Sequence, residues 1–302
     1  MKQVMVALDG SSFAEQALGP AIDIANRAGG RLDLVSVCNP ADAGPALADV
    51  ELSLEEEVSR YLDDVREKIG PHDDLEVEAR VLTGYPAAAL VEEVEERRVD
   101  LAVLSTHGRG PVSRAWLGSV ADRFVREAPC PVLLVRPDET DGAADFNEPF
   151  EVRHVVVPMD GSEVGEAVLE RAAEMARLFG ARITLFSAVG RRELINRDFV
   201  PHVEYVTYDR LLSDRVAQAR TELEEIRERL RTREITADVV VVEDSNPATA
   251  ILEFVSSEKP DLVAMGTHGR KGMARMVLGS VADKVVRSAT TPVLLVRPPW
   301  EE

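Results

Sequence analysis

Short apolar runs alternate with amphipathic stretches through the first half of the chain. Residues 4–8 are apolar and rich in β-branched side chains, which is typical of a buried strand. Residues 13–28 then space their apolar side chains as a helix does, until Gly29 and Gly30 stop it. The alternation continues with expected strands at 32–37, 75–82, 100–104 and 132–135 and expected helices at about 51–69, 86–97 and 119–127. Strands that alternate with helices in this way predict a parallel sheet.

The second half repeats this order of elements. Its expected strands fall near 153–158, 182–188, 237–242, 261–265 and 292–296. Its middle helix carries a sustained apolar stripe from Leu212 to Leu230, which we expect to face the core. We therefore predict an α/β protein with two tandem doubly wound domains, each a five-stranded parallel sheet flanked by helices. The expected domains are 1–137 and 152–299, joined by a polar linker at 138–151 that contains Pro and Gly.

Several sequence segments recur between the halves. T-H-G-R stands at 106–109 and 267–270, and L-G-S-V-A-D stands at 117–122 and 278–283. Asp9-Gly10-Ser11 recurs as Asp160-Gly161-Ser162, an offset of 151, whereas Pro86 recurs as Pro247, an offset of 161. The second half therefore has ten extra residues between Ser162 and Pro247, and the poorest match, at 189–209, is where we expect them. A repeat of this length indicates two domains rather than a solenoid.

Charge and cysteine content narrow the classes of function. The net charge is −19, from 35 basic and 54 acidic residues, which opposes loose binding to nucleic acid or to anionic lipid. The two cysteines, Cys38 and Cys130, both lie in the first half and do not predict a disulfide framework. No apolar run approaches the ~20 residues of a membrane span, and the first residues lack the features of a signal peptide. We expect a cytoplasmic protein, and we find no cluster with the spacing of metal ligands.

The most distinctive polar residues follow the first and fourth strands of each half. In the second half, Gly266 and Gly269 leave the fourth strand, and Gly279-Ser280 opens the next helix. A glycine lets a ligand approach the backbone, and a helix N-terminus favours an anion through its free N–H groups. The pattern is neither a Walker A loop nor a dinucleotide-binding fingerprint. It suits a polyphosphate bound beyond the carboxyl ends of the strands, where the strand order reverses.

These residues resemble the universal stress protein family. Its ATP-binding members carry G-x2-G-x9-G-[ST] after the fourth strand, which matches Gly266, Gly269, Gly279 and Ser280. They also carry an aspartate after the first strand, in a V-P-x-D-G-S context that matches residues 157–162. The resemblance covers both halves almost end to end, so the chain is similar to a tandem universal stress protein.

The resemblance implies a nucleotide site in each half, with ATP as the ligand and Mg²⁺ or Mn²⁺ arriving on its phosphates. In the second half, Asp160 would contact the ribose or the metal, and Pro158 and Ala188 would line the adenine pocket with Met265 nearby. The ribose and phosphates would be held by Gly266, Gly269, Gly279, Ser280 and Val281. The matching positions of the first half are Ala7, Asp9, Val37, Leu104, Ser105, Gly108, Gly118, Ser119 and Val120.

The first half departs from the family pattern at two of these positions. Ser105 replaces the first glycine of the motif, and Ala7 stands where the second half has Pro158. A serine adds a Cβ atom and a hydroxyl group where the backbone should lie close to the ligand. We expect the change to weaken the first site or to alter its ligand.

Simpler roles remain open for several of these residues. Asp9 and Asp160 could cap the helices that follow them. Ser119 with Asp122, and Ser280 with Asp283, have the spacing of capping boxes, a role compatible with phosphate binding. His107 and His268 have no partner that would make them acids or bases, so we expect them to orient the loop.

Three functions follow from this pattern. The first is a nucleotide-binding regulatory protein of a stress response. The second is a slow ATP hydrolase, although the sequence offers no dedicated base, arginine finger or Walker B carboxylate. The third is an interaction scaffold with vestigial pockets.

The family also implies an assembly. The last strands of the two halves, at 132–135 and 293–296, are short apolar edges that would pair with each other and make one chain a pseudo-dimer. A homodimer of chains is left open.

Overall fold

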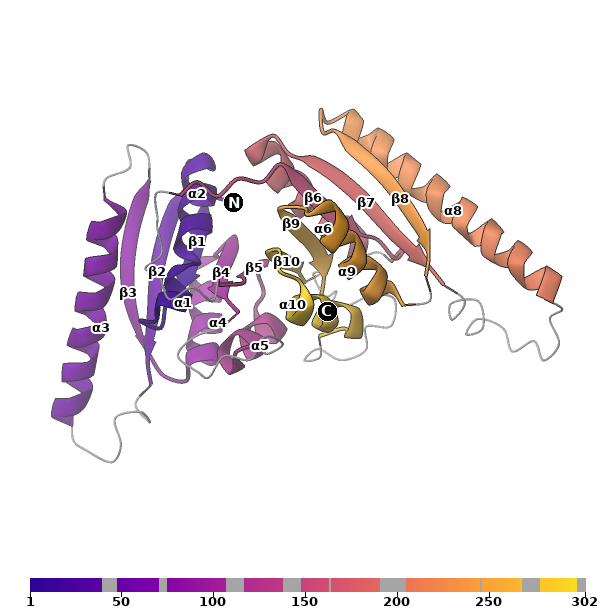
Figure 1. Cartoon of the computed structure of the whole chain (residues 1–302). Helices are drawn as coiled ribbons and strands as arrows, with labels where there is room; N and C mark the ends of the chain where they lie inside the picture. The colour runs from indigo at the N-terminus through magenta and orange to yellow at the C-terminus, as the bar shows by residue number, and fades with distance from the viewer. Residues whose placement is uncertain are drawn as a thin grey trace. The chain divides into compact units, whose positions relative to one another are not determined.

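The structure is a computed structural model that forms two compact units (Figure 1). One unit runs from Met1 to Glu151, and the other takes up the described residues from Val152 onward. The residues that the structure describes are 1–39, 48–70, 75–106, 117–137, 148–162, 164–190, 205–244, 246–267 and 278–297.

The first unit is a parallel sheet of five strands flanked by helices. Its strands are β1 (Gln3–Ala7), β2 (Arg31–Cys38), β3 (Glu76–Thr83), β4 (Leu101–Ser105) and β5 (Val132–Val135). Its helices are α1 (Ser12–Glu15), α2 (Leu18–Arg27), α3 (Ala48–Ile69), α4 (Pro86–Arg97) and α5 (Ser119–Glu127). The strand order is β3-β2-β1-β4-β5, so the direction of winding reverses between β1 and β4.

The second unit repeats this arrangement. Its strands are β6 (His154–Pro158), β7 (Arg182–Val189), β8 (Ala237–Glu243), β9 (Leu262–Gly266) and β10 (Val293–Val296). Its helices are α6 (Val164–Phe179), α8 (Tyr205–Arg231), α9 (Pro247–Glu258) and α10 (Ser280–Ser288). The strand order, β8-β7-β6-β9-β10, reverses between β6 and β9. The predicted fold class is confirmed.

The helix expected over residues 13–28 is two helices, and that prediction was wrong. α1 ends at Glu15 and α2 begins at Leu18. Pro20 lies in the first turn of α2, where it has no N–H group to donate to the carbonyl of Gln16 and its ring crowds that carbonyl. Arg171 occupies the matching position in the second unit, and α6 runs unbroken through it.

The ten extra residues of the second half enter at two places. Cys38 pairs with Thr83 across β2 and β3, and Val189 pairs with Glu243 across β7 and β8. Thr83 and Glu243 are 160 positions apart, nine more than the offset of 151 at the paired residues of β2 and β7. The tenth residue therefore lies between β8 and α9, outside the range of 189–209 in which we expected all ten.

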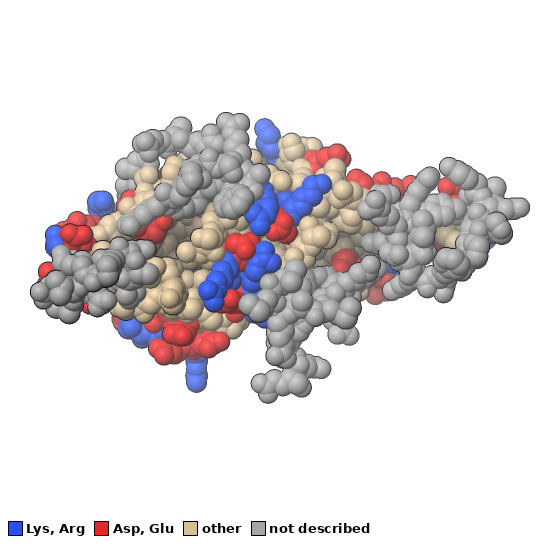
Figure 2. All heavy atoms as spheres, turned by 90° about the horizontal axis from the view of Figure 1, so that it is seen from below, with Lys and Arg blue, Asp and Glu red and all other residues tan. Residues whose placement is uncertain are grey.

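The surface charges, the helices and the cysteines bear on the expectations drawn from composition. Basic side chains lie beside acidic ones on the face shown in Figure 2. None of the helices among the described residues is both long and apolar enough to cross a membrane. Cys38 and Cys130 are buried free thiols. The cytoplasmic location, the pairing of the last strands and a homodimer stay predictions.

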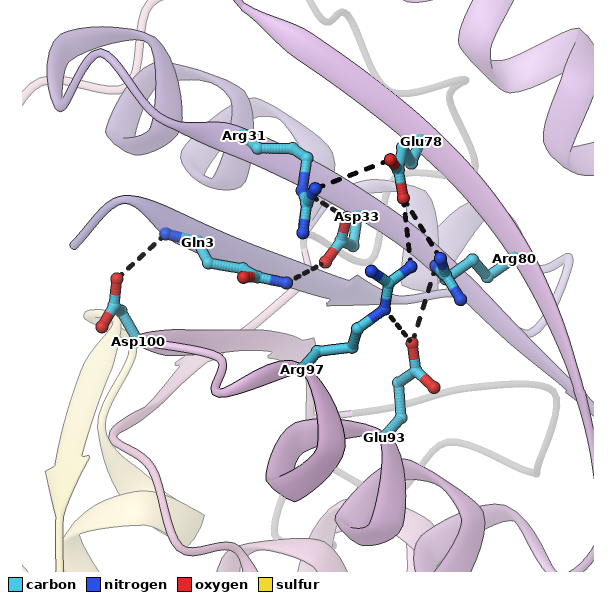
Figure 3. A network of polar contacts seen from close by, with 8 residues as sticks. All are labelled: Gln3, Arg31, Asp33, Glu78, Arg80, Glu93, Arg97 and Asp100. Atoms are coloured by element: carbon cyan, nitrogen blue, oxygen red, sulfur yellow. Dashed lines mark hydrogen bonds and ion pairs between the residues drawn. The ribbon is translucent and has the colours of Figure 1, made fainter.

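A network of charged side chains lies between the sheet and α4 in the first unit (Figure 3). Its members include Gln3, Arg31, Asp33, Glu78, Arg80, Glu93 and Arg97. Asp33 of β2 is 1% exposed and accepts a hydrogen bond from Gln3 Nε2 at 2.8 Å. Glu93 of α4 is 7% exposed, and its Oε1 lies 3.5 Å from Arg97 Nε and 3.7 Å from Arg80 Nε. The buried carboxylates are thus charge-compensated from strand and helix together.

The second unit replaces the two buried carboxylates with uncharged side chains, although it keeps an ion pair between Arg182 and Asp238 at the positions of Arg31 and Glu78. Thr184 stands in place of Asp33, and Phe254 stands in place of Glu93. The Phe254 ring packs against Phe186 of β7 with its centroid 5.0 Å away. Since the same fold forms without them, the buried carboxylates of Asp33 and Glu93 are not needed to specify it, in keeping with the small net value of many buried ion pairs.

We expect Glu93→Gln to change the pH dependence of stability. Burial raises the pKa of the Glu93 carboxyl, an effect that nearby Arg80 partly offsets. A carboxyl whose pKa is higher in the folded than in the unfolded chain (about 4.3) makes folding less favourable as pH rises through that window. The variant lacks this titration. Its free energy of unfolding, measured by urea denaturation, should therefore rise relative to wild type as the pH increases above the unfolded-state pKa of about 4.3.

Glu92→Gln is the matched control, because it removes the same charge from an exposed position of α4. The test is the slope of the unfolding free energy against pH, compared between wild type and Glu93→Gln. The absolute difference in stability is less informative, because the substitution also removes the ion pairs of Glu93. Parallel curves for wild type and Glu93→Gln would contradict the raised pKa.

Candidate functional site

An Asp-Gly-Ser turn follows β1 and fixes the first carboxylate of the site. Asp9 Oδ1 accepts hydrogen bonds from Ser11 N at 3.0 Å and from Ser11 Oγ at 2.6 Å. Gly10 has a φ of 79°, a left-handed conformation that favours glycine. Ser11 in turn accepts from Ala14 N at 3.2 Å and is the N-cap of α1. Capping is therefore the role of Ser11, and Asp9 shapes the turn that precedes it.

The turn after β6 has the same backbone form. Ser162 N donates to Asp160 Oδ1 at 3.0 Å, and Gly161 has a φ of 72°. Asp160 is exposed, whereas Asp9 is only partly exposed. In both units the turn presents a carboxylate at the carboxyl end of the strand beside which the winding reverses.

The second component is the start of the last helix. Gly118 is the N-cap of α5, and its N–H group donates to the carbonyl of Thr106 at 2.9 Å. Gly279 is the N-cap of α10 and donates to the carbonyl of Thr267 at 2.8 Å. The chain that leaves each fourth strand therefore returns to the strand end before the helix begins. Neither threonine was among the predicted site residues, although both open the repeated T-H-G-R segment.

The predicted capping boxes were wrong. Neither N-cap makes a side-chain hydrogen bond, because both are glycine, and Ser119 and Ser280 are the first helical residues. The carboxylates expected to complete the boxes accept from arginines one turn later instead, Asp122 from Arg126 and Asp283 from Arg287. The box spacing is present, but it begins one residue too late to cap the helix.

The glycines leave the helix ends open. Gly118 and Gly279 have φ values of −54° and −59°, which any residue can adopt, so backbone conformation does not require glycine there. Their effect is the absence of a capping side chain. Among the described residues, the amides of Ser119, Val120 and Ala121 have no acceptor, nor do those of 280–282. Free amides at the positive end of a helix dipole form a site for an anion.

The predicted pocket residues on the first two strands of each unit are partly exposed. Ala7 and Val37 are half-buried in the first unit, and Pro158 and Ala188 are half-buried in the second, although most residues of these strands are buried. They form an apolar surface at the carboxyl ends of adjacent strands.

The fourth strands differ more between the units. Leu104 and Met265 are almost wholly buried, with 4% and 5% exposed. Ser105 ends β4 with 8% exposed, whereas Gly266 ends β9 partly exposed. Gly108 and Gly269 lie outside the described residues, as do His107 and His268.

The basic side chains of the last helices are already engaged. Arg123 pairs with Glu127, and Arg126 pairs with Asp122, in both cases one turn along α5. In α10, Lys284 donates to Thr249 Oγ1 at 2.9 Å. Within the described part of the chain, no group of three or more His, Cys, Asp or Glu side chains could hold a metal ion. The groups that these helices offer to an anion are therefore mainly backbone N–H groups.

Comparison with known proteins identifies relatives over the whole chain. A family model described as the universal stress protein family matches residues 1–136 and 151–297. A universal stress protein of Mycolicibacterium smegmatis is 28% identical over 307 aligned positions, which cover 98% of this chain and 97% of that one. A universal stress protein of Mycobacterium tuberculosis is 29% identical over 232 positions, 77% of this chain and 72% of its own length.

A solved structure supports the fold. The crystal structure of a universal stress protein from Archaeoglobus fulgidus superposes with a TM-score of 0.67 at 19% identity, covering 97% of this chain and 95% of that chain. The family model accounts for both halves of the sequence nearly end to end. The chain therefore belongs to the universal stress protein family, with two copies of the family's domain in tandem.

Proposed function

We propose that each half of the chain binds ATP, with the phosphates at the N-terminus of α5 or α10, and that the protein acts as a nucleotide-dependent regulator rather than as an enzyme. One observation carries the proposal. Both helices begin at a glycine whose backbone conformation any residue could adopt, and both keep three amides without a partner among the described residues. A bound anion supplies the missing partner.

Two other helices of the same chain, α1 and α9, are capped by side chains, whereas α2 and α4, with Ala17 and Tyr85 at the N-cap, are not. Ser11 caps α1, and Asn246 caps α9 by accepting from Thr249 N at 3.3 Å. A capping side chain contributes about 1 kcal/mol relative to alanine. The matched helices α4 and α9 differ in their caps, whereas α5 and α10 both begin at an uncapped glycine, and this recurrence supports a ligand role.

The remaining groups suit the rest of a nucleotide. The half-buried pairs Ala7 with Val37, and Pro158 with Ala188, would contact an apolar base. Asp9 and Asp160 would contact the ribose hydroxyl groups or a Mg²⁺ or Mn²⁺ ion carried by the phosphates. The phosphates would be held by the first three backbone amides of each helix. These include the amides of Ser119 and Val120 in the first half and of Ser280 and Val281 in the second.

We expect Gly279→Asp to abolish binding in the second half without unfolding it. Aspartate is a favourable N-cap, and its carboxylate would accept from the amides that the phosphates would otherwise use. Isothermal titration calorimetry with ATP should show the stoichiometry falling from two to one per chain. The ligand-free variant should be as stable as wild type or more stable by a few tenths of a kcal/mol.

Two further variants control this experiment. Gly279→Asn caps the same amides without charge and should weaken binding less than aspartate does, which separates occupation of the amides from repulsion. Gly118→Asp makes the same change in the first half and should leave the second site intact. Two sites of unchanged affinity in Gly279→Asp would contradict the proposal.

We expect Ser105→Gly to tighten binding in the first half. The change removes the Cβ atom and hydroxyl group that distinguish the end of β4 from the end of β9 at Gly266. Relieving a small steric obstacle in a pocket is worth roughly tenfold in affinity. Measured in a Gly279→Asp background, the first site should bind ATP more tightly. Measured in a Gly118→Asp background, where the second site remains, Gly266→Ser should weaken that site. Equal affinities would show that this position tolerates either residue.

A further inference from the structure

Tyr85 is an aromatic residue at an unusual place. It is 72% exposed, and among the described residues only Leu211, at 43%, joins it as an exposed large apolar side chain. Tyr85 is the N-cap of α4 but makes no side-chain cap hydrogen bond. A large exposed ring therefore stands where a small polar side chain would stabilise the helix.

The second unit has the expected residue at this position. Asn246 precedes the first proline of α9, as Tyr85 precedes that of α4. Its side chain accepts from Thr249 N at 3.3 Å, and its own N–H group donates to Asp244 Oδ1 at 2.7 Å. The connection from β3 to α4 thus lacks the side-chain cap that the matching connection from β8 to α9 has. This difference suggests that Tyr85 has a role other than capping.

The backbone before Tyr85 crosses the end of the neighbouring strand. Gly84 N donates to the carbonyl of Cys38, the last residue of β2, at 2.9 Å. Gly84 has a φ of 142°, which side-chain-bearing residues rarely adopt. The connection from β3 to α4 is one residue shorter than the connection from β8 to α9. This short turn places Tyr85 beside the carboxyl ends of β2 and β3.

An apolar row leads from Tyr85 toward β1. Leu82 of β3 is in register with Val37 of β2, and Ala7 ends β1 on the next strand. All three are half-buried. Leu82 lies on the face covered by α4, because Arg80, two residues earlier, pairs with Glu93 of that helix. These residues offer a shallow apolar floor whose outer end is at Tyr85.

The open amides of α5 lie toward the opposite end of this row. α5 begins after β4, and the order β3-β2-β1-β4 places three interstrand spacings, about 14 Å, between β3 and β4. A ligand with an anionic tail at α5 and a flat apolar head on the floor would have its head nearest Tyr85. Aromatic side chains stack on nucleobases whatever the identity of the base, because every base has a π-face.

We propose that Tyr85 stacks on the base of the nucleotide held by the first half, giving this half a contact for the base that the second half lacks. The assignment rests on the proposed function, since it needs the phosphates at α5. It makes the two sites unequal in what they select: stacking at the first site requires a flat base on the ligand, whereas inorganic triphosphate lacks one.

The test compares Tyr85→Asn with Tyr85→Phe in the Gly279→Asp background, where only the first site remains. Tyr85→Asn installs the residue of the second unit, so the midpoint of thermal unfolding without ligand should rise by about 2–4 °C as the helix gains a cap. Its affinity for ATP should fall about tenfold, the usual effect of losing one stacked ring. Tyr85→Phe keeps the ring and should bind as the parent does. Affinity for inorganic triphosphate should be the same in all three.

The outcomes separate this inference from the proposed function. A rise in stability with unchanged ATP affinity in Tyr85→Asn would overturn the stacking role and leave the nucleotide site standing. Equal losses of ATP and triphosphate affinity would also overturn it, because they would indicate a disturbed site rather than a lost base contact. Absence of ATP binding by the wild-type chain would overturn the proposed function and this inference together.

Discussion

The hydrogen bond between the N-cap glycine and the threonine after the fourth strand is the constraint on which each site depends. Gly118 N to the Thr106 carbonyl, and Gly279 N to the Thr267 carbonyl, tie a helix start to a strand end. The bond satisfies the amide of the N-cap and orients the next three without satisfying them. Since Thr106 N itself donates to the Val135 carbonyl of β5, the helix start is anchored to the sheet rather than to a loop alone. The geometry offered to an anion is therefore set before any ligand arrives.

The two halves share this backbone frame and differ in the side chains placed on it. The charged Glu93 in one unit stands where Phe254 packs against Phe186 in the other. The end of the fourth strand is Ser105 in one and Gly266 in the other. These side-chain differences leave the main-chain hydrogen bonds in place, because those bonds do not involve the side chains. A duplicated domain can thus keep the geometry of the helix start, where we propose that an anion binds, while its core and the residues at the strand ends diverge.

How far the sequence predicts the molecule depends on which interactions set each feature. Strand positions follow from apolar periodicity and the repeat, which local sequence carries. Pro20 also indicates the break before α2, because proline disrupts a helix upstream of its own position. The helical spacing of the apolar residues around it nevertheless favoured the prediction of one continuous helix. The capping boxes failed for another reason: the spacing S-x-x-D does not reveal which residue leaves the helical conformation, and that is settled by the bond from Gly118 to Thr106. The difference between Tyr85 and Asn246 became meaningful only once exposure and cap bonds were known.

A net charge of −19 by itself opposes the binding of a triphosphate, but the arrangement of the charges reduces this opposition at the proposed site. Coulomb repulsion between exposed charges is screened within about 8–10 Å in physiological salt, so the distant carboxylates act weakly at the site. Close to it, the carboxylates of Asp122 and Asp283 are each paired with an arginine one turn along the same helix. The amides at the helix start act at contact distance, where screening is least. Local dipoles can therefore outweigh the overall charge, and acidity opposes loose attraction of polyanions without opposing a fitted one.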